Sequence, residues 1–422
     1  MNPFEFNSPI CFEDYYDWEN IYPKPYNSKT TSPYSKARVI LMNGCETENV
    51  FFLHNFQRNC TDNNLRRELA KIRTIHQQMQ KKIQCLKPID ENILEETIIY
   101  ELLAVDLTAG MAQCEPDKYV KEALDFALLE DFDHLYRYSN LMKLEYGKDA
   151  SFLVGKYSEI TPGRPTISHH RYPADNVKRY NNPNVALITK LHSNIITAAE
   201  QQTMNFYMNV CNLYPSDMGR RLYQEIGMVE EEHVTQYGSL LNTTLSYLEN
   251  LVMHMYTTCY LYYSAMKDEI DKNLYCVWEK CFFQSVTNLQ VSAELLEKYE
   301  RKSWKALIPD GTFPELLKLH PNVDYVRNVL RCTVTYTGLL EGYAPVNDLP
   351  NDANFFKYQA TVNNKIPCVP SHEVICKTIN RCGHDYRFEK CPNPVEALRD
   401  RHCDNYTLGR VKTCNRDEKK EY

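Results

Sequence analysis

The fold is decided by two stretches of sequence, which read ELLAVDLTAGMAQCEPDKYVKEALDFALLEDFDHLYRY at residues 101–138 and EQQTMNFYMNVCNLYPSDMGRRLYQEIGMVEEEHVTQY at residues 200–237. At an offset of 99 residues (200 − 101) they align without a gap, and Pro116 falls on Pro215. Self-similarity at a fixed offset indicates that one structural unit occurs twice. The chain therefore contains an internal repeat.

Each stretch has the pattern of two helices joined at its proline. Proline is costly inside a helix but favoured at its first turn, so Pro116 marks a turn between two helices. Glu101 and Asp131 each lie 15 residues from it (116 − 101 and 131 − 116). Folding the two arms together places both acids about 22 Å from the turn, at 1.5 Å per residue. The second stretch repeats this spacing with Glu200 and Glu230.

A histidine follows the second acid of each hairpin by three residues. His134 follows Asp131, and His233 follows Glu230, so each acid shares a helix face with its histidine. Apolar residues surround these acids, and a buried acid is costly unless it is paired or binds a metal. The sequence therefore predicts six metal ligands at one level of the fold: Glu101, Asp131, His134, Glu200, Glu230 and His233.

This set of ligands resembles the ferritin-like superfamily of di-iron and di-manganese carboxylate proteins, such as rubrerythrins, bacterioferritins and manganese catalases. Those proteins take one acid from each of two helices and an acid-x-x-His pair from each of the other two. The resemblance covers roughly residues 93–245. It implies a mainly α fold, a four-helix bundle with a long crossover at the irregular residues 143–190, and two iron or two manganese ions as cofactors.

A third hairpin follows the second at an offset of 55 residues (255 − 200). Tyr262 aligns with Tyr207, but the ligand positions hold Met255, Ser285 and Asn288. None of these three is a good ligand for a hard metal ion. We therefore predict that the third hairpin extends the bundle without binding metal.

The other segments complete the predicted organisation. We expect an extended arm over residues 1–64, a ferritin-like helical domain over 65–304 with hairpins at 93–142, 191–245 and 250–300, a mixed region over 305–367 and a Cys-rich tail over 368–422. The tail has no C-x-x-C pair, so it lacks the pattern of a rubredoxin-type iron site. A zinc site, disulfides and unpaired thiols all stay open for its cysteines.

Composition limits the class of protein. Hydrophobic residues make up 43% and charged residues 24%, which is typical of a globular chain. The net charge of −7 argues against a bulk nucleic-acid binder. No apolar run approaches the roughly 20 residues of a membrane span, and the N-terminus lacks the pattern of a secretory signal. We expect a cytoplasmic homo-oligomer, with a surface or coat layer as the alternative location.

The resemblance implies redox chemistry with oxygen or hydrogen peroxide as oxidant and an unidentified electron donor. Ferroxidase, peroxidase and catalase activities all fit the ligands. The family usually has Glu where this chain has Asp131, so we expect the shorter arm to move that metal or to open a coordination position, and to make Asp131 catalytic. Glu130 and Asp106 stay open as nearby substitutes for Asp131. Which carboxylates bridge the ions stays open. The alternative is a structural coat or shell protein in which metal only braces the bundle, suggested by 31 Tyr and 16 Cys.

Overall fold

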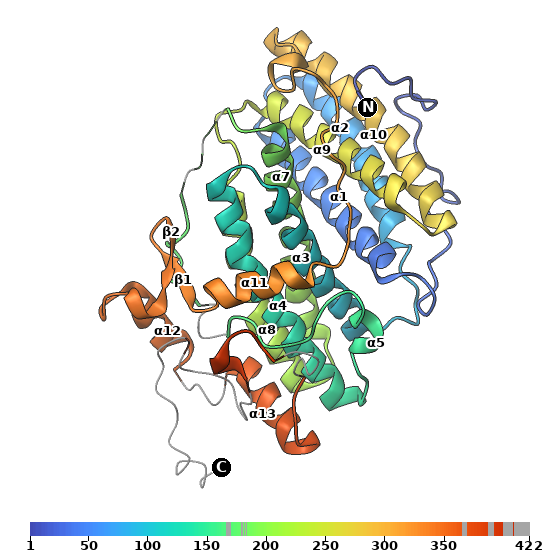
Figure 1. Ribbon diagram of the computed structural model, residues 1–422. Coiled ribbons are helices and arrows are strands. Elements are labelled where there is room, and N and C mark those ends of the chain that lie inside the picture. The colour runs from blue at the N-terminus through green and yellow to red at the C-terminus, as the bar shows by residue number, and fades with distance from the viewer. Residues whose placement is uncertain are drawn as a thin grey trace.

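The computed structural model describes residues 1–165, 170–178, 180, 182, 184–364, 369–386, 392–399 and 408. The fold is mainly helical, as predicted (Figure 1). Its long helices are α1 (Pro33–Asn59), α2 (Asn63–Gln84), α3 (Ile93–Cys114), α4 (Lys118–Tyr146), α7 (Leu187–Leu213), α8 (Asp217–Gly238), α9 (Tyr247–Asp268) and α10 (Lys272–Glu300). In the described residues, no helix is both long and apolar enough to cross a membrane.

The two predicted repeats form helical hairpins, α3–α4 and α7–α8. Side-chain caps begin three of these helices: Asn92 caps α3, Asp117 caps α4 and Ser216 caps α8. At α3 the cap is reciprocal, because Glu95 also accepts a hydrogen bond from the backbone of Asn92. The prolines lie in the turns, where the sequence predicts them.

Helices α9 and α10 form the predicted third hairpin. Ser246 and Glu249 make a capping box at the start of α9, and Asp271 caps α10. Met255, Ser285 and Asn288 are all buried. The third hairpin is therefore present as predicted, and these three residues lie in its buried core.

A fourth hairpin, α1–α2, was not predicted. The expectation of an extended arm over residues 1–64 is wrong for residues 33–59, which form α1. Helix α1 packs against α2, α3, α7 and α9, so it is enclosed on several sides. Its buried residues include the polar Ser35, Asn43 and Glu46, and a helix buried in this way has no apolar stripe to reveal it.

The four hairpins make two halves, which lie side by side in Figure 1. One half contains α3, α4, α7 and α8, and the other contains α1, α2, α9 and α10. Helices α1 and α7 meet across the boundary at Gly44. A Cβ atom there would lie 3.0 Å from the carbonyl oxygen of Ala198 and 3.0 Å from Cβ of Gln202. Glycine therefore allows this close approach, whereas a larger residue would require a neighbouring atom to move by a few tenths of an ångström.

The segment between α4 and α7 is mostly irregular, as predicted, and contains the short helix α5 (Ser151–Val154). It packs on α4 at Gly163, whose backbone N–H donates to Asp133 Oδ1 at 2.9 Å. The next backbone N–H, that of Arg164, donates to the carbonyl oxygen of Leu129 at 3.2 Å. These contacts hold the crossover against the helix that carries Asp131.

The C-terminal part contains several short elements, which follow the four hairpins in the chain. They are η1 (Trp304–Ala306), α11 (Val323–Thr333), the antiparallel strands β1 (Tyr336–Leu339) and β2 (Gly342–Pro345), η2 (Val346–Asp348), α12 (Asn354–Val362), α13 (Pro370–Cys382) and η4 (Glu396–Leu398). Helix α13 packs on α4 and α8. Of the tail cysteines, Cys368, Cys391, Cys403 and Cys414 lie outside the described residues.

Candidate metal centre

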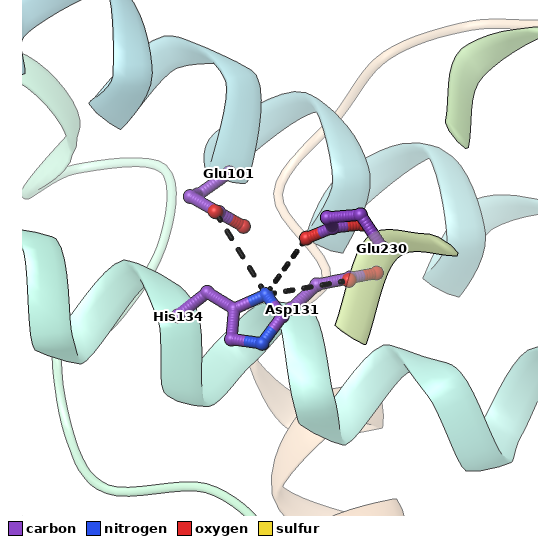
Figure 2. Close-up of side chains that lie close together, drawn as sticks. All are labelled: Glu101, Asp131, His134 and Glu230. Carbon is purple, nitrogen blue, oxygen red and sulfur yellow. Dashed lines mark ion pairs between the residues drawn. The ribbon is translucent and has the colours of Figure 1, made fainter. Parts of the chain in front are cut away.

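The six predicted ligands meet at the centre of the α3, α4, α7 and α8 half. None of them is more than 1% exposed. Their ligand atoms form two groups of four, which are Glu101, Asp131, His134 and Glu230, and Asp131, Glu200, Glu230 and His233. In each group the ligand atoms lie within 4.8 Å of one another, which suits a single metal ion. The groups share Asp131 and Glu230, and Figure 2 shows the first of them.

The two imidazoles face the shared carboxylates from opposite sides. His134 Nδ1 lies 2.9 Å from Glu230 Oε1 and 3.9 Å from Glu101 Oε1. His233 Nδ1 lies 3.2 Å from Glu230 Oε2, 3.3 Å from Asp131 Oδ1 and 3.7 Å from Glu200 Oε2. The ring centroids are 6.2 Å apart, so each imidazole serves one group.

The carboxylate oxygens of the centre are poorly satisfied by the protein. Among the described residues, seven of the eight oxygens of Glu101, Asp131, Glu200 and Glu230 have no hydrogen-bond donor in good geometry. The eighth, Glu101 Oε1, accepts a hydrogen bond from Tyr207 at 2.5 Å. Buried polar groups are normally paired. Carboxylate oxygens and imidazole nitrogens are ligands of divalent iron, manganese and zinc, so the donor set fits metal ions of this kind.

The same crowding shifts the pKa values. Burial, followed by repulsion from neighbouring carboxylates, holds the pKa values of Glu101 and Asp131 well above their usual range. Burial also raises the pKa of Glu200 to about 7. Burial would raise the pKa of Glu230 too, but the two imidazoles lower it below its usual value. For His233, burial is outweighed by the carboxylates around it, which raise its pKa well above normal. Without metal, several of these acids therefore hold protons.

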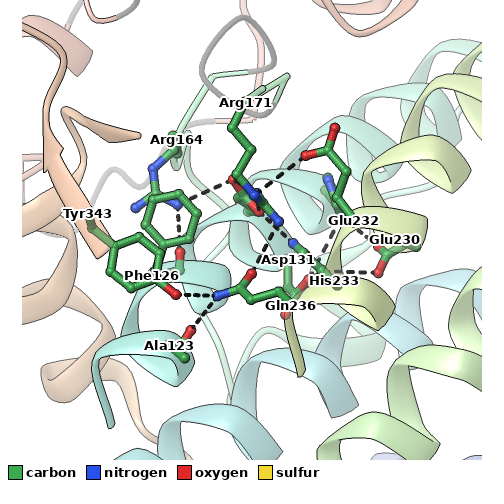
Figure 3. A network of polar contacts seen from close by, with 12 residues as sticks. Ala123, Phe126, Asp131, Arg164, Arg171, Glu230, Glu232, His233, Gln236 and Tyr343 are labelled. Atoms are coloured by element: carbon green, nitrogen blue, oxygen red, sulfur yellow. Dashed lines mark hydrogen bonds and ion pairs between the residues drawn. The ribbon is translucent and has the colours of Figure 1, made fainter. Parts of the chain in front are cut away.

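A second layer of polar residues orients His233. Its Nε2 lies 2.5 Å from Glu130 Oε2, which leaves Nδ1 to face the centre. Glu130 also accepts hydrogen bonds from Arg171 at 2.9 and 3.0 Å, and Figure 3 shows Arg171 above His233. Burial would raise the pKa of Glu130, but Arg171 and His233 hold it well below its usual value. A carboxylate on the outer nitrogen is the usual partner of a metal-binding histidine.

Asp131 lies between the two ligand groups and belongs to both. The sequence suggested that its short arm would leave one ion open. In the structure Asp131 belongs to both groups, together with Glu230. The open coordination position stays a prediction. The two acids common to both groups are the ones within the acid-x-x-His pairs.

The sequence suggested Glu130 only as a substitute ligand, not as the partner of His233, and it gave no sign of Arg171. Arg171 lies in the irregular crossover, where no period or motif marks it. Glu130 is adjacent to Asp131 and could be found only as an extra acid near the ligand level.

Comparison with known proteins gives no relative. The chain matches no family model, no curated protein and no solved structure. The site must therefore be interpreted from its own geometry.

Proposed function

We propose that the protein is a ferritin-like dimetal-carboxylate redox protein that acts on oxygen or hydrogen peroxide. One observation carries the proposal, which is that two four-residue ligand groups share Asp131 and Glu230. Shared carboxylates can hold two ions close together, and the ions of two-metal catalytic sites lie about 3.5–4 Å apart. The proposed ions are two iron or two manganese ions.

The residues have distinct roles in this proposal. Glu101 and His134 would hold one ion, Glu200 and His233 the other, and the two shared acids would bind both. When bound, a pair of redox-active ions supplies the electrons for reduction or disproportionation of a small oxidant. Glu130 and Arg171 keep His233 oriented with Nδ1 toward the centre. The buried helices around the site exclude bulk water, which strengthens electrostatic interactions there.

The test measures metal content and turnover together. We expect about two ions per chain after loading with ferrous or manganous ion, and consumption of hydrogen peroxide with or without a supplied reductant. The variant Glu230→Ala/His233→Ala removes a shared acid and one imidazole, so both ions and the turnover should be lost.

The chain offers a matched control for this variant. Ser285 and Asn288 lie 55 residues further on (285 − 230 and 288 − 233), at the same positions of the third hairpin. Ser285→Ala/Asn288→Ala should leave metal content unchanged. A wild-type chain that binds less than half an ion after loading would contradict the proposal. Two bound ions without turnover would favour the alternative, a structural coat or shell protein in which the metal braces the fold.

A further inference from the structure

The core of the second half has the same plan as the metal centre. The 55-residue offset relates α1–α2 to α3–α4 as well as α9–α10 to α7–α8, and it places Glu46 at the position of Glu101 (101 − 55). Tyr207 donates to Glu101 Oε1 at 2.5 Å, and Tyr262 donates to Glu46 Oε1 at 2.6 Å. The same hydrogen bond, made by equivalent residues, occurs in both halves.

The remaining ligand positions of the second half hold other residues. His76 takes the place of Asp131 (131 − 55), and Met79 takes the place of His134. The other three positions hold Met255, Ser285 and Asn288. This half therefore has one carboxylate where the metal centre has four.

The residues at these positions form a hydrogen-bond network around Glu46 and His76. His76 Nδ1 lies 2.6 Å from Glu46 Oε2, and His76 Nε2 lies 3.0 Å from both Met255 Sδ and Asn288 Nδ2. Both oxygens of Glu46 and both nitrogens of His76 thus have partners. Asn288 Oδ1 is the one atom of this group without a hydrogen bond among the described residues.

The contrast in hydrogen bonding has an energetic consequence. A buried carboxylate with two strong donors is stable in a folded core, whereas four crowded carboxylates repel one another and lose hydration. The first half needs metal, or protons, to offset this cost. The second half has no such cost, because its single acid is satisfied by His76 and Tyr262.

We propose that α1, α2, α9 and α10 form a metal-free counterpart of the centre, in which the Glu46–His76–Tyr262 network replaces the ions. This half stays folded without metal, and it keeps the helices of the first half in place until the ions bind. This loading role rests on the proposed metal binding. Contact between the halves supplies the means, because α1 packs directly on α3 and α7, which carry Glu101 and Glu200.

Hydrogen exchange of the full wild-type chain tests this division of roles. We compare protein stripped by a chelator with protein loaded with manganous ion, and read exchange peptide by peptide. Amides of residues 93–146 and 187–238 should lose protection when metal is removed, while amides of 33–84 and 247–300 keep theirs. Equal loss in both halves, or loss confined to the second, would overturn the proposal.

A second experiment tests the equivalence of the two cores. The variant carries His76→Asp, Met79→His, Met255→Glu, Ser285→Glu and Asn288→His, which reproduces the ligands of the first half. Metal content should rise from about two to about four ions per chain. A helical variant, checked by circular dichroism, that gains no ion would refute the equivalence. If the variant does not fold, the wild-type exchange pattern decides.

The proposed function can fail separately from this inference. A wild-type chain that binds two ions without turnover contradicts only the redox chemistry. A wild-type chain that binds about four ions contradicts only the metal-free second core. A wild-type chain that takes up no metal contradicts the proposed function and the loading role together.

Discussion

Glu130 Oε2 lies 2.5 Å from the outer nitrogen of His233, and this single contact fixes which nitrogen of the imidazole faces the metal centre. Glu130→Gln should therefore weaken metal binding without removing any ligand. Loss of such a partner typically lowers metal affinity by about 10–100-fold. Titration with manganous ion measures the effect. Glu122→Gln, on an exposed part of the same helix, serves as the control and should bind as the wild type does.

Metal should stabilise the protein increasingly as the pH rises. The raised pKa values of Glu101, Asp131 and Glu200 mean that the metal-free folded state binds more protons than the unfolded state. For Glu200 the penalty is absent below the unfolded pKa of about 4.3 and is fully developed above its folded pKa of about 7. Metal-free protein should therefore lose stability from about pH 5 to about pH 7 as Glu200 ionises, and the raised pKa values of Glu101 and Asp131 act in the same direction.

The raised pKa of His233 acts in the same direction, since its contribution is lost as the pH rises through the folded value. The lowered pKa values of Glu130 and Glu230 do not oppose the trend, because both acids are ionised in either state across this window. Bound metal replaces the protons and should add about 2.7 kcal/mol at a free concentration of 100 Kd. Denaturant unfolding at several pH values, with and without manganous ion, measures both effects. A metal-free stability that rises with pH would contradict the assignment.

Two tyrosines give a matched pair of variants. Tyr207→Phe and Tyr262→Phe each remove one hydrogen bond to a buried carboxylate, so each should cost about 1–3 kcal/mol of unfolding free energy. Only Tyr207→Phe touches a proposed ligand, so only this variant should change metal affinity. Equal changes in affinity would show that the two cores are coupled rather than distinct.

Asp131→Glu separates shared binding from catalysis. Asp131 belongs to both ligand groups, and a longer arm in a fully buried site must displace its neighbours. Turnover of hydrogen peroxide should fall more than metal content does. Unchanged turnover at full metal content would remove the length of this side chain from the mechanism.

The six residues of the candidate metal centre could be predicted because the sequence signals that mark them are local. Prolines in the turns and acids within apolar helices set Glu101, Asp131, Glu200 and Glu230 at one depth, whatever the rest of the chain does. Helix α1 gave no such signal, because its surroundings are other helices and it buries Glu46 and Asn49 as readily as Leu53. The pairing of Glu46 with His76 and Tyr262 depends on tertiary contacts between α1, α2 and α9. Arg171 depends on the path of an irregular segment, which no period describes.

The absence of a side chain at Gly44 affects the position of a second helix, α7, as well as its own. It lets α1 lie against α7 at Ala198 and Gln202, which are two residues before and two residues after Glu200. A methyl group at that position would press on the turn of α7 that carries Glu200, so α1 or this turn would have to move by a few tenths of an ångström. We therefore expect the selectivity of the proposed metal centre for ions of different radius to depend also on Gly44, which has no donor atom and belongs to the other half of the molecule. Searches for variants with altered metal selectivity should include position 44 beside the ligands themselves.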